Sequence, residues 1–66
     1  MKRKKLKMWR IDNDLTQEQL ANSLDVTVAY INQIELGKVK PSNKLLYKFK
    51  EVYNIVDVLG LFEVGE

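Results

Sequence analysis

The stretch LTQEQLANSLDVTVAYINQIELGKVKPS, which runs from Leu15 to Ser42, decides the fold of this chain. It contains two short segments with helical spacing of apolar residues, a tight turn between them, and a basic loop after the second. The second segment has a polar face that no other part of the chain is suited to cover. These residues therefore predict a close pair of helices with one polar face left open.

Capping residues set the limits of both helices. Thr16 and Gln19 form the capping box S/T-x-x-E/Q, which predicts that the first helix begins after Thr16. Thr27 is a favourable N-cap for the second helix, and Gly37 suits the left-handed residue that ends it. Asp25 lies in the turn between them, where glycine would be less strained.

Three further helices are expected outside this stretch. One covers residues from about 4 to 12, one begins after the N-cap Ser42 and ends near Asn54, and a short one covers about 56–62. The prediction is an all-α, compact bundle of four to five helices. It forms a single domain over residues 1–66, with the helix-turn-helix at about 16–36.

Length and composition exclude several classes of function. The chain has 66 residues, enough for one domain with one small core. It contains neither cysteine nor histidine, which excludes disulfides and the usual metal sites. Because histidine is also the commonest general base, this composition argues against an enzyme, and no cofactor is expected. No apolar run approaches the ~20 residues that span a bilayer, so we expect a cytoplasmic protein without a membrane partner.

Charge alternates in blocks along the chain, although the net charge is only +2. Residues 1–10 carry +6 and residues 38–50 carry +5, whereas residues 11–37 carry −5 and residues 51–66 carry −4. Two basic segments therefore flank the helix pair. The first of them is expected to form either a flexible arm or the edge of the first helix, through Arg3, Lys4, Lys5 and Lys7.

The second helix of the pair has an uncharged outer face. On a helical wheel Ile31 and Ile34 point toward the core. The opposite arc carries no charge, although 30% of the chain is charged. It consists of Val28, Ala29, Asn32, Gln33 and Leu36. An ordinary solvated face and a protein-interaction face are two interpretations of this arc.

A DNA-reading helix is the third interpretation, and it accounts for each residue of the arc. Asn32 and Gln33 carry amides that donate and accept together, as the N6 and N7 edge of adenine requires. Val28 and Ala29, with Leu36 as a further candidate, are suited to contact thymine methyl groups. The pattern therefore indicates a helix-turn-helix whose second helix lies in the major groove.

Contacts to the DNA backbone are expected from residues around this face. Lys38 and Lys40 follow the second helix directly. Gln17 lies in the first turn of the preceding helix, where the helix N-terminus favours an anion. Thr27 and Tyr30 border the face and are also expected to contact phosphate, although packing against the preceding helix suits Tyr30 equally well.

From Leu6 to Leu59 the chain resembles the Cro/cI-type helix-turn-helix repressors, also called the XRE-like family. The residues that carry the resemblance are Leu6, Arg10, Leu15, Thr16, Gln17, Leu20, Ala21, Leu24, Val26, Ile31, Ile34, Glu35, Gly37, Lys38, Pro41, Ser42 and Leu46. Asp14 and Asp25 depart from the family, in which glycine is frequent at both positions.

The resemblance implies the residues that contact DNA and one structural ion pair. Base contacts are implied for Val28, Ala29, Asn32 and Gln33, and phosphate contacts for Gln17, Lys38 and Lys40. The implied ion pair joins Arg10 to Glu35. The resemblance also favours a small Cro-like regulator of a phage or mobile element in a bacterial cell.

The predicted function is sequence-specific binding of double-stranded DNA as a repressor that occludes a promoter. An activator with the same contacts is one alternative, and a protein-interaction module, an antirepressor or antitoxin, is another. The apolar tail, residues 55–66, predicts a homodimer with C2 symmetry on a palindromic operator. Cooperative binding of monomers on DNA is the alternative to that dimer, and no small-molecule ligand is expected.

Overall fold

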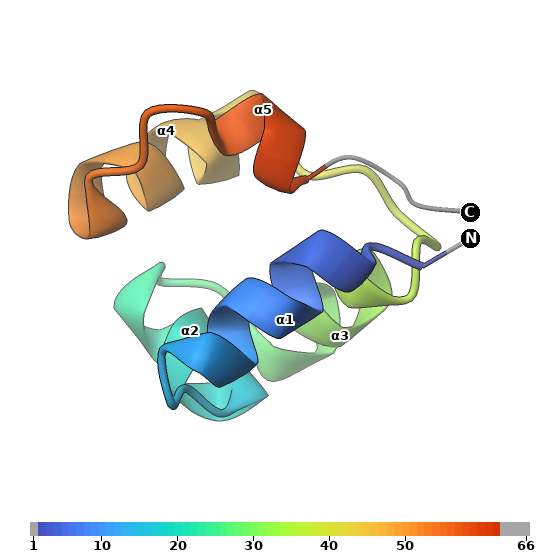
Figure 1. The fold of residues 1–66 in the computed structure, drawn as a ribbon. Helices are drawn as coiled ribbons and strands as arrows, with labels where there is room; N and C mark the ends of the chain where they lie inside the picture. Colours follow the sequence, from blue (N-terminus) through green and yellow to red (C-terminus); the bar gives the residue numbers. More distant parts are fainter. Residues whose placement is uncertain (1, 63–66) are drawn as a thin grey trace.

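The computed structural model describes residues 2–62, and this part of the chain folds into helices joined by short turns and loops. The helices are α1 (Lys4–Asp12), α2 (Gln17–Ser23), α3 (Val28–Glu35), α4 (Asn43–Tyr53) and α5 (Val58–Leu61) (Figure 1). The predicted all-α bundle is confirmed. The end of the expected apolar tail, residues 63–66, lies outside the described residues. None of the helices between residues 2 and 62 has the length and apolar character needed to cross a membrane.

Side-chain caps begin α2, α3 and α4 at the predicted residues, whereas α1 begins without one. Thr16 Oγ1 accepts a hydrogen bond from the Gln19 backbone N–H at 3.0 Å, and Gln19 Oε1 accepts one from the Thr16 N–H at 2.9 Å, which completes the capping box. Thr27 and Ser42 cap α3 and α4 through their side-chain oxygens. α5 begins later than expected, because the Asp57 carboxylate caps it and sets its first turn.

α1, α2 and α3 end in the same kind of turn, which places one left-handed residue after the helix. That residue is Asp14 (φ 56°), Asp25 (φ 60°) and Gly37 (φ 77°), respectively. In the turn between α2 and α3, the Val26 N–H donates to the Ala21 carbonyl at 3.0 Å. This hydrogen bond closes the turn. Aspartate is strained in left-handed backbone relative to glycine, so the turns at Asp14 and Asp25 are less relaxed than that at Gly37.

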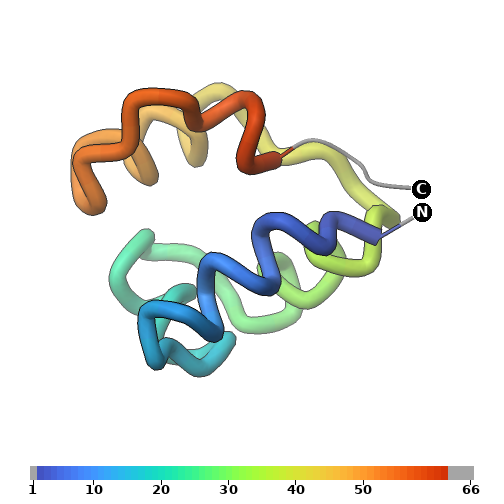
Figure 2. Tube along the Cα trace, viewed as in Figure 1, coloured from blue at the N-terminus to red at the C-terminus, as the bar shows by residue number. Residues whose placement is uncertain are grey.

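The helices form two groups with the core between them. α1, α2 and α3 lie together on one side of the molecule, and α4 and α5 lie on the other (Figures 1 and 2). α2 and α3 pack directly against each other, and α1 contacts both α3 and α5. The core between the groups consists of Leu6, Leu20, Ala21, Leu24, Ile31, Ile34, Leu45, Phe49 and Phe62.

Four aromatic rings connect α1, α4 and the end of α5. The centroid of Trp9 lies 4.9 Å from those of both Phe49 and Tyr53. Phe49 lies 5.3 Å from Tyr53 and 5.1 Å from Phe62, also between centroids. The rings are tilted or edge-on, as is favourable for aromatic pairs at these distances. Phe62, which belongs to the apolar tail in the sequence, is therefore part of the core.

Candidate nucleic-acid interface

α3 turns its uncharged face away from the core, as its periodicity predicts. Ile31 and Ile34 are 1% and 0% exposed and pack inward. On the other side Val28 is 40% exposed, and Ala29 is exposed as well. Asn32, Gln33 and Leu36 are half-buried and complete this face. The amides and small apolar groups that were candidates for reading bases are therefore accessible from outside.

A buried ion pair ties α1 to the end of α3. Arg10 Nε donates to Glu35 Oε2 at 2.7 Å, and Arg10 Nη2 donates to Glu35 Oε1 at 3.2 Å. The two side chains are only 11% and 4% exposed. Arg10 Nη1 also donates to the Leu15 carbonyl at 2.8 Å, in the segment that leads into α2. The pair that the family resemblance implied is thus present, and it connects the elements on either side of α2.

Gln17, at the start of α2, bonds to two residues of α3. Its Nε2 donates to Glu35 Oε1 at 3.1 Å and to Asn32 Oδ1 at 3.3 Å. Both N–H groups of this amide donate to groups inside the protein. The group of Gln17 that remains suited to contact a phosphate is therefore its backbone N–H. That N–H lies in the first turn of α2, where backbone donors have no partner within the helix.

The loop after α3 presents the lysines that were expected to contact phosphate. Lys38 and Lys40 are both exposed. Tyr30 Oη accepts a hydrogen bond from the Ser42 backbone N–H at 3.0 Å, so this ring links α3 to the start of α4. Its hydroxyl hydrogen is still available as a donor. Thr27 is exposed and its side chain accepts the Tyr30 N–H at 3.1 Å.

The expectation that Arg3 lies in a flexible arm or on a helix edge is wrong. Arg3 is 4% exposed. Its Nε donates to the Phe62 carbonyl at 2.9 Å, and its Nη1 donates to the carbonyls of Ile34 at 2.7 Å and Val39 at 2.9 Å. The planar guanidinium reaches several carbonyls at once, which a lysine ammonium on a single flexible stem does less well. In the sequence Arg3 is one cation among several, and no periodicity marks it as buried.

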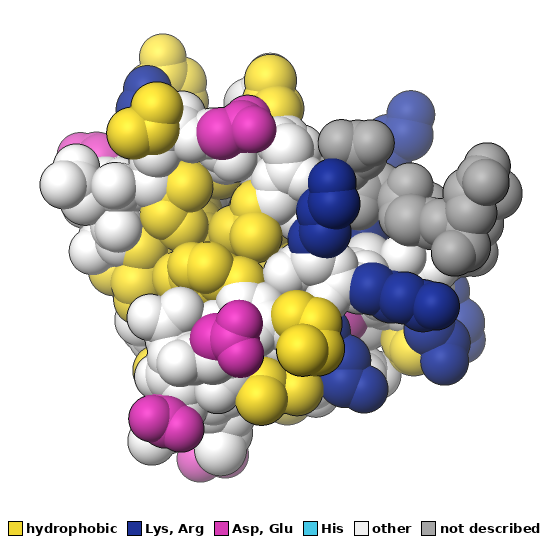
Figure 3. Space-filling model, viewed as in Figure 1, with side chains coloured by type: hydrophobic (Ala, Val, Ile, Leu, Met, Phe, Trp, Pro, Cys, Tyr) yellow, Lys and Arg dark blue, Asp and Glu magenta, His cyan; other side chains and the backbone are white. Residues whose placement is uncertain are grey.

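The lysines of the N-terminal segment, unlike Arg3 and Arg10, are exposed on the surface. Lys2, Lys4 and Lys7 line an open groove of about 450 Å³ between α1 and α3, together with Asn32 and Leu36. Most of the Lys and Arg side chains visible in Figure 3 gather on the side of the molecule where α1 begins and α3 ends. Positive charge therefore borders the uncharged face of α3 without lying on it.

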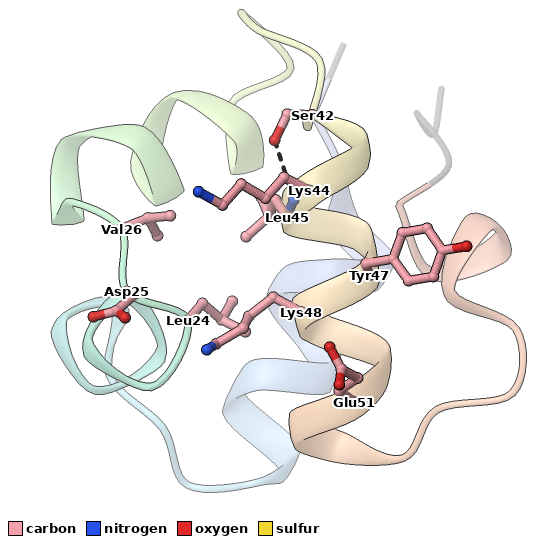
Figure 4. Close-up of a pocket in the computed structure, with 9 residues that line it drawn as sticks. All are labelled: Leu24, Asp25, Val26, Ser42, Lys44, Leu45, Tyr47, Lys48 and Glu51. Carbon is pink, nitrogen blue, oxygen red and sulfur yellow. Dashed lines mark hydrogen bonds between the residues drawn. The ribbon is translucent and has the colours of Figure 1, made fainter.

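A second groove separates the turn after α2 from α4 (Figure 4). It has a volume of about 550 Å³, and Leu24, Val26 and Leu45 form its apolar part. Lys44 and Lys48 extend over it from α4. Between residues 2 and 62 every fully buried side-chain N or O atom has a hydrogen-bond partner. In the same part of the chain no group of three acidic residues is placed to hold a metal ion.

Known proteins similar to this chain are regulators of transcription by name. Residues 6–61 match the model of the family described as helix-turn-helix. A protein of Methanocaldococcus jannaschii, named as an uncharacterized HTH-type transcriptional regulator, is 42% identical over 63 residues, which cover 94% of this chain and 96% of the relative. One of Archaeoglobus fulgidus with the same description is 40% identical over 65 residues, which cover 97% and 92%. No solved structure matches the chain significantly.

Proposed function

The chain belongs to the helix-turn-helix family of transcriptional regulators, and we propose that it reads a specific sequence of double-stranded DNA with the outer face of α3. The observation that carries this proposal is the contrast between that face and its surroundings. The face is open and uncharged, whereas Lys38 and Lys40 are exposed in the loop that follows it, and Lys4 and Lys7 of α1 line the groove beside it. Base edges in the major groove are neutral and phosphates are anionic, so this arrangement matches a duplex.

The contacts divide into two kinds with different consequences. Val28, Ala29, Asn32 and Gln33 contact base edges, and therefore determine which sequence is bound. Gln17, Thr27, Tyr30, Lys38 and Lys40 contact phosphates, and therefore set position and overall affinity. Selection of bound duplexes from a random DNA pool tests this function. A shared sequence motif, bound more weakly as salt rises, is the expected result.

Failure to select any motif, with no binding at low salt, would contradict the function. That outcome would favour the alternative, a module that binds a protein partner through the same fold. The gathering of basic side chains beside α3 argues for DNA instead, because an anionic backbone is the partner that such a border attracts.

Replacing Gln33 with alanine is expected to relax the choice of base at one position of the selected site. Removing the paired amide should cost about 1–3 kcal/mol on the preferred base and little on the others. Binding measured on a set of single-base variants of the site shows this directly. Equal weakening on every variant would mean that Gln33 does not read a base.

Replacing Lys40 with alanine should instead weaken binding to all sequences alike. The slope of log affinity against log salt is negative, and the loss of one contact between a lysine and a phosphate should make it shallower by about 1. Titrations at several salt concentrations on the selected duplex and on an unrelated duplex measure this slope. An unchanged slope would place Lys40 away from the phosphates.

We further propose that the protein is a repressor that acts by covering a promoter, as small Cro-like regulators do. Its proposed location is the cytoplasm, where the DNA is. A protein bound at a promoter blocks access to it by occupying the DNA. A transcription assay on a template with the selected site decides the sign of regulation, and activation would overturn repression.

The surface of α4 and α5 is proposed to form a homodimer. Tyr47 and Leu59 are 73% and 71% exposed, although both are large and apolar. They line one open groove of about 290 Å³ between α4 and α5, beside Leu46 and Val58. Exposed apolar side chains around a groove are typical of an interface between proteins. A second copy bound to this surface would form a C2 dimer with two α3 helices. A palindromic site requires one such helix for each half-site.

Replacing Leu59 with lysine should disrupt this dimer without unfolding the protein, because the side chain is exposed. The dimer dissociation constant is expected to rise at least about tenfold, since a charge would be buried without a partner. Sedimentation equilibrium measures the change. Ile11→Lys on α1, which alters another exposed apolar residue, is the matched control. An equal effect of both variants, or of neither, would contradict an α4–α5 interface.

A further inference from the structure

The hydrogen bonds behind α3 determine which way the side-chain amide of Asn32 faces. We propose that Asn32 meets DNA as a hydrogen-bond donor, and that the base it reads is guanine rather than adenine. This inference rests on the proposed DNA binding by α3 and specifies one base of the site. It replaces the adenine contact that the residue type alone suggested.

The direction of these bonds begins at the buried ion pair. Arg10 can only donate, and the ionised Glu35 carboxylate can only accept. Glu35 Oε1 already accepts from Arg10, and it also faces the Gln17 amide at 3.1 Å. The group of Gln17 that faces this oxygen must therefore be its nitrogen. A Gln17 side chain turned the other way would bring two oxygens together.

The same nitrogen determines the orientation of Asn32. The second hydrogen of Gln17 Nε2 is directed at Asn32, 3.3 Å away, so an oxygen has to receive it. Asn32 Oδ1 is thus turned toward α2, and the Nδ2 group of Asn32 is not used in this bond. Within residues 2–62 the structure shows no hydrogen bond from Nδ2. The amide is half-buried at the edge of the open face, so this donor is accessible to DNA.

The two purines differ in what they offer to a donor. Guanine presents two adjacent acceptors, N7 and O6, in the major groove, whereas adenine presents one acceptor and one donor. Bidentate pairing with adenine needs Asn32 Oδ1 to accept from adenine N6 on the DNA side, whereas the bond from Gln17 turns this oxygen toward α2. Gln33 has no such bond to α2 in the described residues, so its amide is free to turn and to match adenine.

The test measures base preference at the position that Asn32 reads, found as the position where Asn32→Ala relaxes the choice. With the unchanged protein, guanine is expected there. In Gln17→Ala the Asn32 amide is free to turn, and the ratio of affinities for guanine and adenine should fall about tenfold. Gln17→Ala should have no further effect on base preference in a protein that already carries Asn32→Ala. Lys40→Ala, which is expected to weaken all duplexes alike, is the control for a general loss of affinity.

The possible failures are distinguishable. Absence of any selected motif would count against the proposed function as a whole. A selected motif with adenine at the Asn32 position, or a guanine preference that Gln17→Ala leaves unchanged, would overturn the orientation of Asn32 alone. A separate readout is hydrogen exchange of the side-chain amides in the free protein. That of Gln17 should be slower than that of Gln33, and equal rates would contradict the bonds from Gln17.

Discussion

Replacing Glu35 with alanine is expected to lower the free energy of unfolding by about 3–5 kcal/mol, because it leaves the Arg10 guanidinium buried without its counter-charge. Nε and Nη2 of Arg10 would both be deprived of their acceptor, and only the bond from Nη1 to the Leu15 carbonyl would remain. A domain of this size has little stability in reserve. Urea unfolding followed by circular dichroism should show a largely unfolded variant.

A double replacement distinguishes the effect of the two charges on stability from the effect of the volume that the two side chains occupy. Arg10→Met together with Glu35→Leu removes both charges and keeps apolar side chains of similar length. We expect the double variant to recover most of the stability, since buried ion pairs often replace well with apolar groups. A double variant as unstable as Glu35→Ala would contradict this explanation and would assign the stability to the hydrogen bonds of the pair.

Replacing Arg3 with methionine is expected to cost about 2–4 kcal/mol, because it removes three bonds from a charged donor to buried or partly buried carbonyls. These bonds connect the end of α3, the following loop and the residue after α5. The same urea titration measures the effect.

Lys2→Met is the matched control for this second prediction. It removes one positive charge from the adjacent residue, whose side chain is exposed. Its effect should stay within about 0.5 kcal/mol, as is usual for a surface substitution. If both variants were destabilised equally, the general positive charge of the segment would be responsible, and the buried position of Arg3 would not matter.

The helices and turns were predictable because each signal depends on a few neighbouring residues. The capping box at Thr16 and the N-caps at Thr27 and Ser42 are local patterns, and they appear in the structure as expected. The outward direction of the α3 face was also predictable, since Ile31 and Ile34 recur at helical spacing. The ion pair between Arg10 and Glu35 came only from the family resemblance, because no spacing rule connects residues 25 apart.

The remaining features depend on contacts between distant segments. The burial of Arg3 requires that α3, the loop at Val39 and the end of α5 meet at one point, and no pattern near residue 3 contains that information. The bond from Gln17 to Asn32 likewise requires the packing of α2 against α3. The short α5 lies within the predicted range of about 56–62, but its exact start was not predicted, because its apolar residues have no clear period and the Asp57 cap was not identified from the sequence.

The most direct measurement of the central claim is the set of intermolecular nuclear Overhauser effects between labelled protein and the selected duplex. If the open face of α3 lies in the major groove, the methyl groups of Val28 and Ala29 will show contacts to thymine methyl or base protons, and the side-chain amides of Asn32 and Gln33 will shift on binding. Contacts that arise from α4 and α5 while these α3 groups stay unperturbed would contradict it.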